Sequence, residues 1–108
     1  MILPETGTGS VYDAEEYMIN DKTMKEIRSE SARAIQKHGR ANTTVSDSVG
    51  RGDKLAILVE EVGEVARVLC DFKQGLLSPE EAHSQLKKEL AQVASVAGLW
   101  LECEINIG

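Results

Sequence analysis

The sequence contains few of the residues that mark special classes of protein. Of its 108 residues only two are cysteine (Cys70 and Cys103), two are proline, and 4% are aromatic. Two cysteines are too few for a disulfide framework or a cysteine-rich zinc site. So little proline also argues against a proline-rich disordered chain. We therefore expect free thiols and a reducing, cytoplasmic location.

Long hydrophobic runs and an excess of positive charge are missing as well. No segment reaches the roughly 18 uninterrupted apolar residues of a membrane helix. The first residues also lack the basic and apolar regions of a signal peptide. Twelve basic against 18 acidic residues give a net charge of −6, which disfavours binding to DNA or RNA. We expect neither a membrane nor a nucleic-acid partner, although metal ions would let such a protein handle a nucleotide.

The sequence does show the signals of helices. Hydrophobic residues make up 42% of the chain, and no alternating pattern of a strand occurs. Asn20 or Asp21 can cap one helix, Asp53 a second, and Ser78-Pro79 begins a third. Glycines follow the first two of these helices. The predicted helices are a possible short one within residues 13–19, then 21–38, 54–72 and 79–103.

These elements predict a single all-α domain with a four-helix-bundle architecture. Residues 1–20 are expected to form an N-terminal arm, and residues 21–108 the helical domain. Residues 39–52 are polar and aperiodic, and we expect a long functional or mobile loop there.

The helix predicted at 54–72 has apolar residues on more than one side. One arc of it, the expected core face, consists of Leu55, Leu58, Val59, Val62, Ala66 and Leu69. Glu61 and Glu64 lie beside this arc. Because one hairpin cannot cover both apolar sides, we expect a homodimer or homotetramer that completes the bundle, with the pocket between subunits.

The last helix has a carboxylate in the middle of its apolar face. Glu89 projects there, and Gln92 follows one turn later at the edge. Burying a charged carboxylate is costly unless it is paired or binds a metal. If the two helices form an antiparallel hairpin, the pair Glu61/Glu64 can face the pair Glu89/Gln92. A set of oxygen ligands suits Mg²⁺ or Mn²⁺ better than Zn²⁺.

Two other interpretations fit the same residues. The glutamates can be surface partners of nearby lysines and arginines on a plain helical bundle. A di-iron bundle would need two Glu-x-x-His pairs, and Glu80-x-x-His83 is a single pair in the first turn of its helix.

The acidic residues also resemble a known family. The segments are Glu60-Glu61-Val62-Gly63-Glu64 and, after a spacer of 24 residues, Glu89-Leu90-Ala91-Gln92. They resemble the Glu-Glu-x-x-Glu and Glu-x-x-Asp signature of the MazG-like nucleoside triphosphate pyrophosphohydrolases, which are all-α enzymes. The similarity covers roughly residues 25–104 and is strongest to small proteins of phages and actinobacteria.

The resemblance implies a function and a set of site residues. Glu61, Glu64, Glu89 and Gln92 would bind Mg²⁺, and Glu60 would be the catalytic base or a ligand of a second metal ion. These enzymes cleave nucleoside triphosphates between the α- and β-phosphates. Gln92 is neutral where the family usually has aspartate, so the chain is either an enzyme with weakened metal binding or a nucleotide-binding homologue with little or no activity.

Two further residues are candidates for substrate binding. Lys54 lies two turns before Glu61 on the same side of its helix and can reach a phosphate, or it can simply be solvated. His38 occupies a position where relatives often have tryptophan, and it can stack on a base. A histidine at the end of a helix can instead interact with the helix dipole. Trp100 is expected in the core or a subunit interface.

Overall fold

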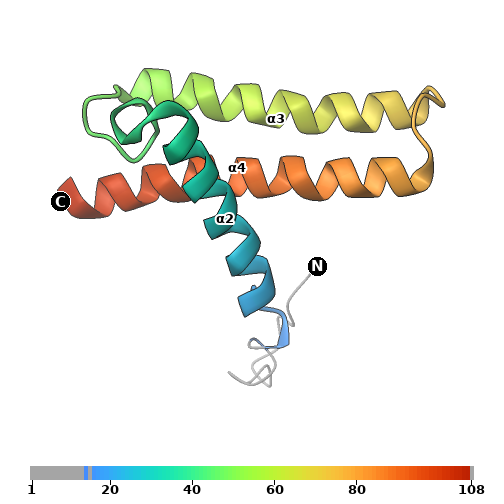
Figure 1. The fold of residues 1–108 in the computed structure, drawn as a ribbon, viewed down its shortest axis with the longest axis horizontal. Coiled ribbons are helices and arrows are strands. Elements are labelled where there is room, and N and C mark those ends of the chain that lie inside the picture. Colours follow the sequence, from blue (N-terminus) through green and yellow to red (C-terminus); the bar gives the residue numbers. More distant parts are fainter. Residues whose placement is uncertain (1–13, 15, 108) are drawn as a thin grey trace.

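The computed structural model describes residues 14 and 16–107, and within them every regular element is a helix (Figure 1). The three long helices are α2 (Asp21–His38), α3 (Arg51–Lys73) and α4 (Pro79–Ile107), and a short 3₁₀ helix, η1, spans Arg40–Asn42. The all-α prediction is confirmed. Most of the expected arm lies outside the described residues, as do residues 13 and 15 of its possible short helix. Of the rest of that segment, Ala14 and Glu16 are helical, whereas residues 17–19 are not.

The helix starts and stops follow from local hydrogen bonding. The Asn20 side chain accepts a hydrogen bond from the Thr23 backbone N–H (2.9 Å) and caps α2, as one of the two predicted caps. Gly39, with φ of 80°, ends that helix in a conformation that favours glycine. At α4, Ser78 and Glu81 exchange hydrogen bonds of 3.0 and 3.1 Å and form a capping box, so the predicted helix start at Ser78-Pro79 is confirmed.

Two predicted helix ends are wrong. Helix α3 begins at Arg51 after the N-cap Gly50, so Asp53 lies inside the first turn and does not cap. Helix α4 continues to Ile107, four residues beyond the predicted end. Both extensions lie where Arg51 hydrogen-bonds with Glu104, an ion pair that anchors the two helix ends to each other. Sequence periodicity cannot show such a contact across 53 residues.

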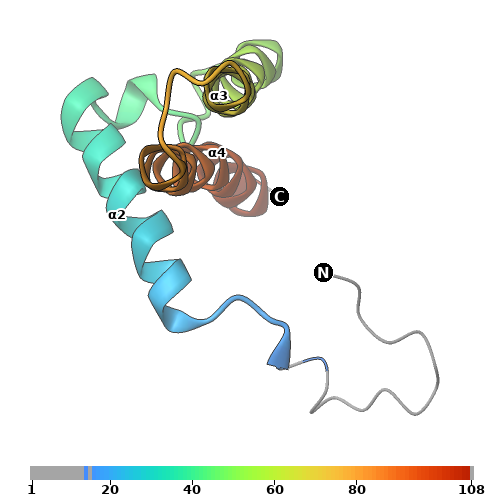
Figure 2. The same ribbon diagram turned by 90° about the vertical axis from the view of Figure 1, so that its right-hand side faces the viewer.

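The helices α3 and α4 form the predicted antiparallel hairpin, and α2 crosses it on the α4 side (Figures 1 and 2). A short turn joins the hairpin, with Gly75 at a φ of 79°. At the crossing, the hydroxyls of Ser31 and Ser95 are 2.8 Å apart, and Ser95 is buried. Small side chains at this point allow the two helices to approach closely.

The segment between α2 and α3 is not the structureless loop that the sequence suggested. It contains η1, and Thr43, Thr44 and Ser46 are buried, with exposed fractions of 6% or less. The Thr44 hydroxyl donates a hydrogen bond to the Val96 carbonyl of α4 (2.8 Å). Because buried hydroxyls need partners, these contacts hold the segment against α4.

Most of the expected core face of α3 is exposed among the described residues, although Leu58 is half-buried. Leu55, Val59, Val62 and Leu69 are between 50% and 59% exposed, whereas Val68 is buried. The stripe that contains the half-buried Ile57, Glu61 and Val65 has the lower exposure and belongs to the side nearer α4. The rest of the expected core face is therefore left largely uncovered by the described residues. The apolar pattern alone does not show which side of α3 meets α4, because that depends on how the helices are arranged in space.

Burial of apolar side chains within the chain is sparse. Among the described residues only Val68 and Cys103 are fully buried apolar residues. Three long helices form one crossed arrangement, and residues 16–107 alone do not complete a four-helix bundle. No helix within residues 16–107 combines the length and apolarity needed to cross a membrane.

Candidate functional site

Glu61 of α3 and Glu89 and Gln92 of α4 come together in the middle of the hairpin. In the orientation that satisfies the Gln92 amide, its Nε2 donates hydrogen bonds to Glu89 Oε2 (2.8 Å) and Glu61 Oε2 (3.2 Å). The two carboxylate oxygens are therefore at most about 6 Å apart, the sum of these two distances. All three side chains are half-buried. The name acidic pair is used below for Glu61 and Glu89.

Negative charge is crowded around Glu61. Its pKa is raised, first by burial and then by the nearby charges of Glu89, Glu60, Glu64 and Glu30. A raised pKa means that the surroundings oppose the ionised form. No cationic side chain is within ion-pairing distance of the acidic pair among the described residues. The Gln92 amide provides two hydrogen bonds, but it carries no charge that would neutralise this site.

The other predicted residues of the acidic motif lie beside the acidic pair. Glu64 has a side chain that is 46% exposed and approaches Arg67 at 3.9 Å, a loose surface contact. Glu60 is exposed to solvent. Within residues 16–107 no three acidic, histidine or cysteine side chains are arranged as a metal site. The structure thus brings together Glu61, Glu89 and Gln92 and leaves Glu64 and Glu60 at the margin.

Glu30 of α2 is a neighbour of this site that the sequence interpretation missed. It is 9% exposed, its charge contributes to the raised pKa of Glu61, and its Oε1 is 2.8 Å from Arg33. The signal was present in the sequence. Glu30 shares a helix face with the half-buried Ile27 and Ala34, and a charge on an apolar face was the criterion that selected Glu89.

Lys54 lies away from the acidic pair, at the open end of the hairpin. It is 2% exposed, and its charge helps to lower the pKa of Glu104. To contact a bound phosphate, as predicted, the Lys54 ammonium would have to leave this buried position.

His38 is exposed at the C-terminal end of α2. Its backbone carbonyl accepts a hydrogen bond from the Asn42 side chain (2.8 Å). The stacking role and the helix-dipole role both remain predictions for its imidazole.

The open end of the hairpin is held by a group of polar contacts around Glu104. Arg51 donates two hydrogen bonds to Glu104 (2.9 and 2.8 Å), and the half-buried Trp100 indole donates a third (3.0 Å). These donors lower the pKa of Glu104 to about 2, with the Arg51 hydrogen bonds as the largest cause. We call this group, Arg51 with Glu104 and Trp100, the end clasp. It gives Trp100 a structural role.

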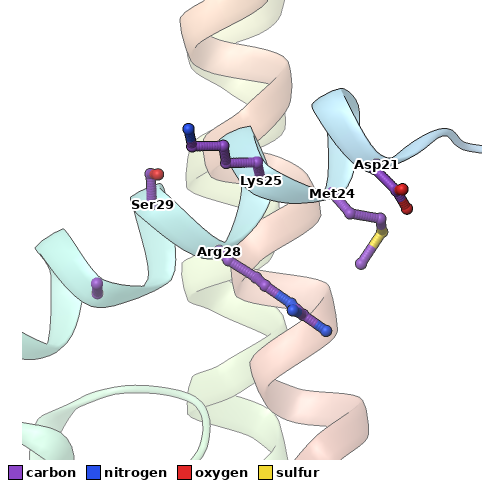
Figure 3. A pocket seen from close by; sticks show the side chains of 6 residues that line it. Asp21, Met24, Lys25, Arg28 and Ser29 are labelled. Atoms are coloured by element: carbon purple, nitrogen blue, oxygen red, sulfur yellow. The ribbon is translucent and has the colours of Figure 1, made fainter.

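A shallow hollow of about 460 Å³ lies along α2 (Figure 3). Its charged lining residues among those described are Asp21, Lys25 and Arg28, and the two basic side chains project in different directions from the helix. Neither member of the acidic pair lines it, so this hollow and the acidic pair are separate features of the surface.

Comparisons of the chain with family models, with curated proteins and with solved structures found no match. The resemblance to the MazG-like enzymes therefore remains a prediction from the acidic motif.

Proposed function

We propose that the chain is a Mg²⁺-dependent nucleotide pyrophosphohydrolase of the MazG-like kind. One observation supports this above all others. The carboxylates of Glu61 on one helix and Glu89 on the next both lie within hydrogen-bond distance of the Gln92 amide nitrogen. The resemblance in sequence had selected the same three residues for a shared metal site. A plain helical bundle gives no reason for two carboxylates to meet between its helices, where their charges repel.

The donor set fits a hard divalent cation. It consists of carboxylate and amide oxygens, which suit Mg²⁺ or Mn²⁺. The raised pKa of Glu61 reflects burial first and then repulsion by neighbouring carboxylates, and a cation would relieve that repulsion. Glu61 and Glu89 would hold the ion, with Glu64 completing the set if it leaves Arg67. Gln92 would present its oxygen after a half-turn of its amide.

The proposed reaction cleaves the triphosphate between the α- and β-phosphates. Water attacks the α-phosphorus, the bond to the bridging oxygen breaks, and a nucleoside monophosphate and pyrophosphate leave. Mg²⁺, when bound, neutralises the phosphate oxygens and acidifies a water molecule. Glu60, exposed beside the acidic pair, would take the proton of the attacking water or bind a second ion. Lys54, once it has left its buried position, and His38 are the proposed substrate contacts.

A second candidate function is nucleotide binding with little or no turnover. The specific observation behind it is the Gln92 amide, whose N–H groups already donate hydrogen bonds to the carboxylates of Glu61 and Glu89. A cation must replace these hydrogen bonds, and the site has one negative charge fewer than the family pattern. Metal binding is then weak, and hydrolysis is slow.

We further propose that the protein acts in the cytoplasm as a homo-oligomer. The exposed apolar arc of α3 supports the oligomer, because Val68 and Cys103 are the only fully buried apolar residues in the part of the chain that the structure describes. The two free cysteines agree with a reducing compartment.

The direct test is pyrophosphate release from a panel of NTPs and dNTPs with Mg²⁺ or Mn²⁺. We expect activity with at least one nucleotide and a loss of at least about 100-fold in Glu89→Gln, because a ligand is removed. Glu102→Gln is the matched control, since Glu102 is an exposed carboxylate of the same helix. It should retain activity.

The remaining outcomes separate the alternatives. Nucleotide binding without pyrophosphate release from any substrate supports the second candidate. A plain bundle predicts that Mg²⁺ leaves the Tm unchanged and that Glu89→Leu stabilises the fold. These two results together would reject both nucleotide functions.

A further inference from the structure

Helix α2 crosses the hairpin next to the acidic pair. At the crossing, the hydroxyls of Ser31 on α2 and Ser95 on α4 are 2.8 Å apart. Gln92, whose amide joins the acidic pair, precedes Ser95 by three residues and so lies one turn away on a neighbouring side of α4. Figures 1 and 2 both show α2 against α4. The side chains of α2 beside Ser31 are therefore close to the proposed metal site.

Glu30 marks the side of α2 that is turned toward the acidic pair. It is 9% exposed, and its charge is one of the causes of the raised pKa of Glu61. Arg33 follows one turn later, and its Nη2 is 2.8 Å from Glu30 Oε1. Arg28, in contrast, lies about 160° around the helix from Glu30 and lines the separate hollow. Arg33 thus brings a positive charge of α2 to the edge of the site.

The contact with Glu30 holds Arg33 in place and leaves some of its donors available. The Arg33 side chain is 63% exposed, whereas that of Glu30 is 11% exposed. A guanidinium has five N–H donors in a planar fork, and one carboxylate can accept hydrogen bonds from only some of them. The buried end of the ion pair is therefore fixed, and the outer end can bind a second anion. Such a fork suits the oxygens of a phosphate.

An anionic substrate needs a positive charge from the chain at this site. The carboxylates around Glu61 already repel one another, and a triphosphate adds further negative charge. Arg67 lies 3.9 Å from Glu64, a proposed metal ligand that must first leave it. Lys54 is 2% exposed and must first leave its buried position. Arg33 can bind a phosphate without either rearrangement.

We propose that Arg33 binds the β- and γ-phosphates of the substrate and so selects nucleoside triphosphates over monophosphates. This inference rests on the proposed function, in which the ion and the attacking water act on the α-phosphate beside the acidic pair. The remainder of the triphosphate then extends toward α2. When the bond from the α-phosphorus to the bridging oxygen breaks, its electron pair stays on that oxygen, and pyrophosphate leaves with an added negative charge. Two N–H groups of Arg33 stabilise that charge.

The first test measures by calorimetry how tightly the full chain binds inorganic pyrophosphate in the presence of Mg²⁺. Arg33→Ala should raise the dissociation constant at least about tenfold, because charge-assisted hydrogen bonds are lost. Arg28→Ala is the matched control, since Arg28 is an exposed arginine on the other side of the same helix. It should leave the dissociation constant unchanged. A wild type that does not bind pyrophosphate at millimolar concentration, or equal affinities of the two variants, would overturn the proposal.

A second variant keeps the proposal testable if Arg33→Ala, which leaves the buried Glu30 unpaired, fails to fold. Arg33→Lys keeps a positive charge for Glu30 but lacks the planar fork. It should melt close to the Tm of the wild type and bind pyrophosphate at least about threefold more weakly. In that case, unchanged affinity in Arg33→Lys would make the contact with Glu30 a surface ion pair without a role in binding.

Turnover separates this proposal from the function on which it rests. If pyrophosphate binding depends on Arg33 but no nucleotide is cleaved, the proposed hydrolysis is wrong and the role of Arg33 stands. If nucleotides are cleaved and Arg33→Ala changes neither kcat/KM nor pyrophosphate binding, the role of Arg33 is wrong and the hydrolysis stands. If both are correct, Arg33→Ala should lower kcat/KM for the triphosphate at least about tenfold and leave the affinity for the monophosphate product within about twofold.

Discussion

Glu61 and Glu104 are carboxylates of the same hairpin in opposite electrostatic surroundings. At the open end, Glu104 accepts hydrogen bonds from Arg51 and Trp100, and its pKa falls to about 2. In the middle, Glu61 shares one amide with Glu89, and burial together with neighbouring carboxylates raises its pKa. The first carboxylate has all the donors it needs, and the second has an excess of negative charge around it.

The difference separates a structural role from a functional one. The end clasp ties the first turn of α3 to the last turns of α4, and it is complete without any added group. Holding the acidic pair together costs free energy, because the two carboxylates repel each other. The two helices stay together in spite of this repulsion because the end clasp and the Gly75 turn join them at both ends. Strained groups of like charge are common at sites that bind cations. The role of each carboxylate is therefore indicated by its hydrogen-bond and charge partners, and not by its position in the hairpin.

The largest expected effect compares the two carboxylates in turnover. Glu61→Gln should lower kcat/KM for the preferred nucleotide at least about 100-fold, because it removes a charged ligand from the proposed ion. Glu104→Gln should change kcat/KM by less than about threefold below the Tm of the variant, since Glu104 belongs to the end clasp. Pyrophosphate release at saturating Mg²⁺ measures both. Equal losses in the two variants would mean that general destabilisation, and not the site, controls activity.

A smaller effect is expected from the residue that links the acidic pair. Gln92→Asp adds a negative charge and removes the amide that donates to Glu61 and Glu89. Mg²⁺ should bind about tenfold more tightly, equivalent to about 1.4 kcal/mol, and turnover should rise. The metal-free variant should melt at a lower temperature because three carboxylates then repel one another. Calorimetric Mg²⁺ titration and thermal melts give the two readouts, and unchanged affinity would exclude Gln92 from the site.

The sequence predicted the helices well because their signals are local. The Ser78–Glu81 capping box and the end of α2 at Gly39 depend on residues within one helical turn, so the local sequence is enough to predict them. The convergence of Glu61 with Glu89 could also be anticipated, since Glu89 interrupts the apolar face of its helix and Glu61 lies beside the apolar arc of its own. In both cases the information lies within a few residues of the feature.

Features that depend on other elements or other chains could not be predicted in the same way. Helical periodicity locates the apolar arc around Val62, but it does not say whether that arc meets α4 or a second chain. The contact of Arg51 with Glu104 joins the ends of two helices and links residues far apart in sequence. Burial of Thr44 likewise depends on a carbonyl of α4, that of Val96. Each of these requires knowledge of how the helices are arranged in space.

The smallest effect concerns pH, and it contrasts the two carboxylates without any ligand. Because the folded pKa of Glu104 lies below its unfolded value, its contribution to stability is present above about pH 4.5 and is lost as the pH falls toward about 2. For Glu61, with a raised folded pKa, the neutral form is favoured in the fold. The contribution of Glu61 to stability is therefore present below about pH 4.5 and is lost as the pH rises through the folded pKa.

Urea unfolding in the absence of divalent ions, from pH 3 to 7, measures both contributions as the free energy of unfolding against pH. Glu104→Gln should flatten the acid side of this curve, and Glu61→Gln should flatten the neutral side. If Glu61→Gln instead steepens the decline toward neutral pH, its ionised form stabilises the fold, and the contrast between the acidic pair and the end clasp is wrong.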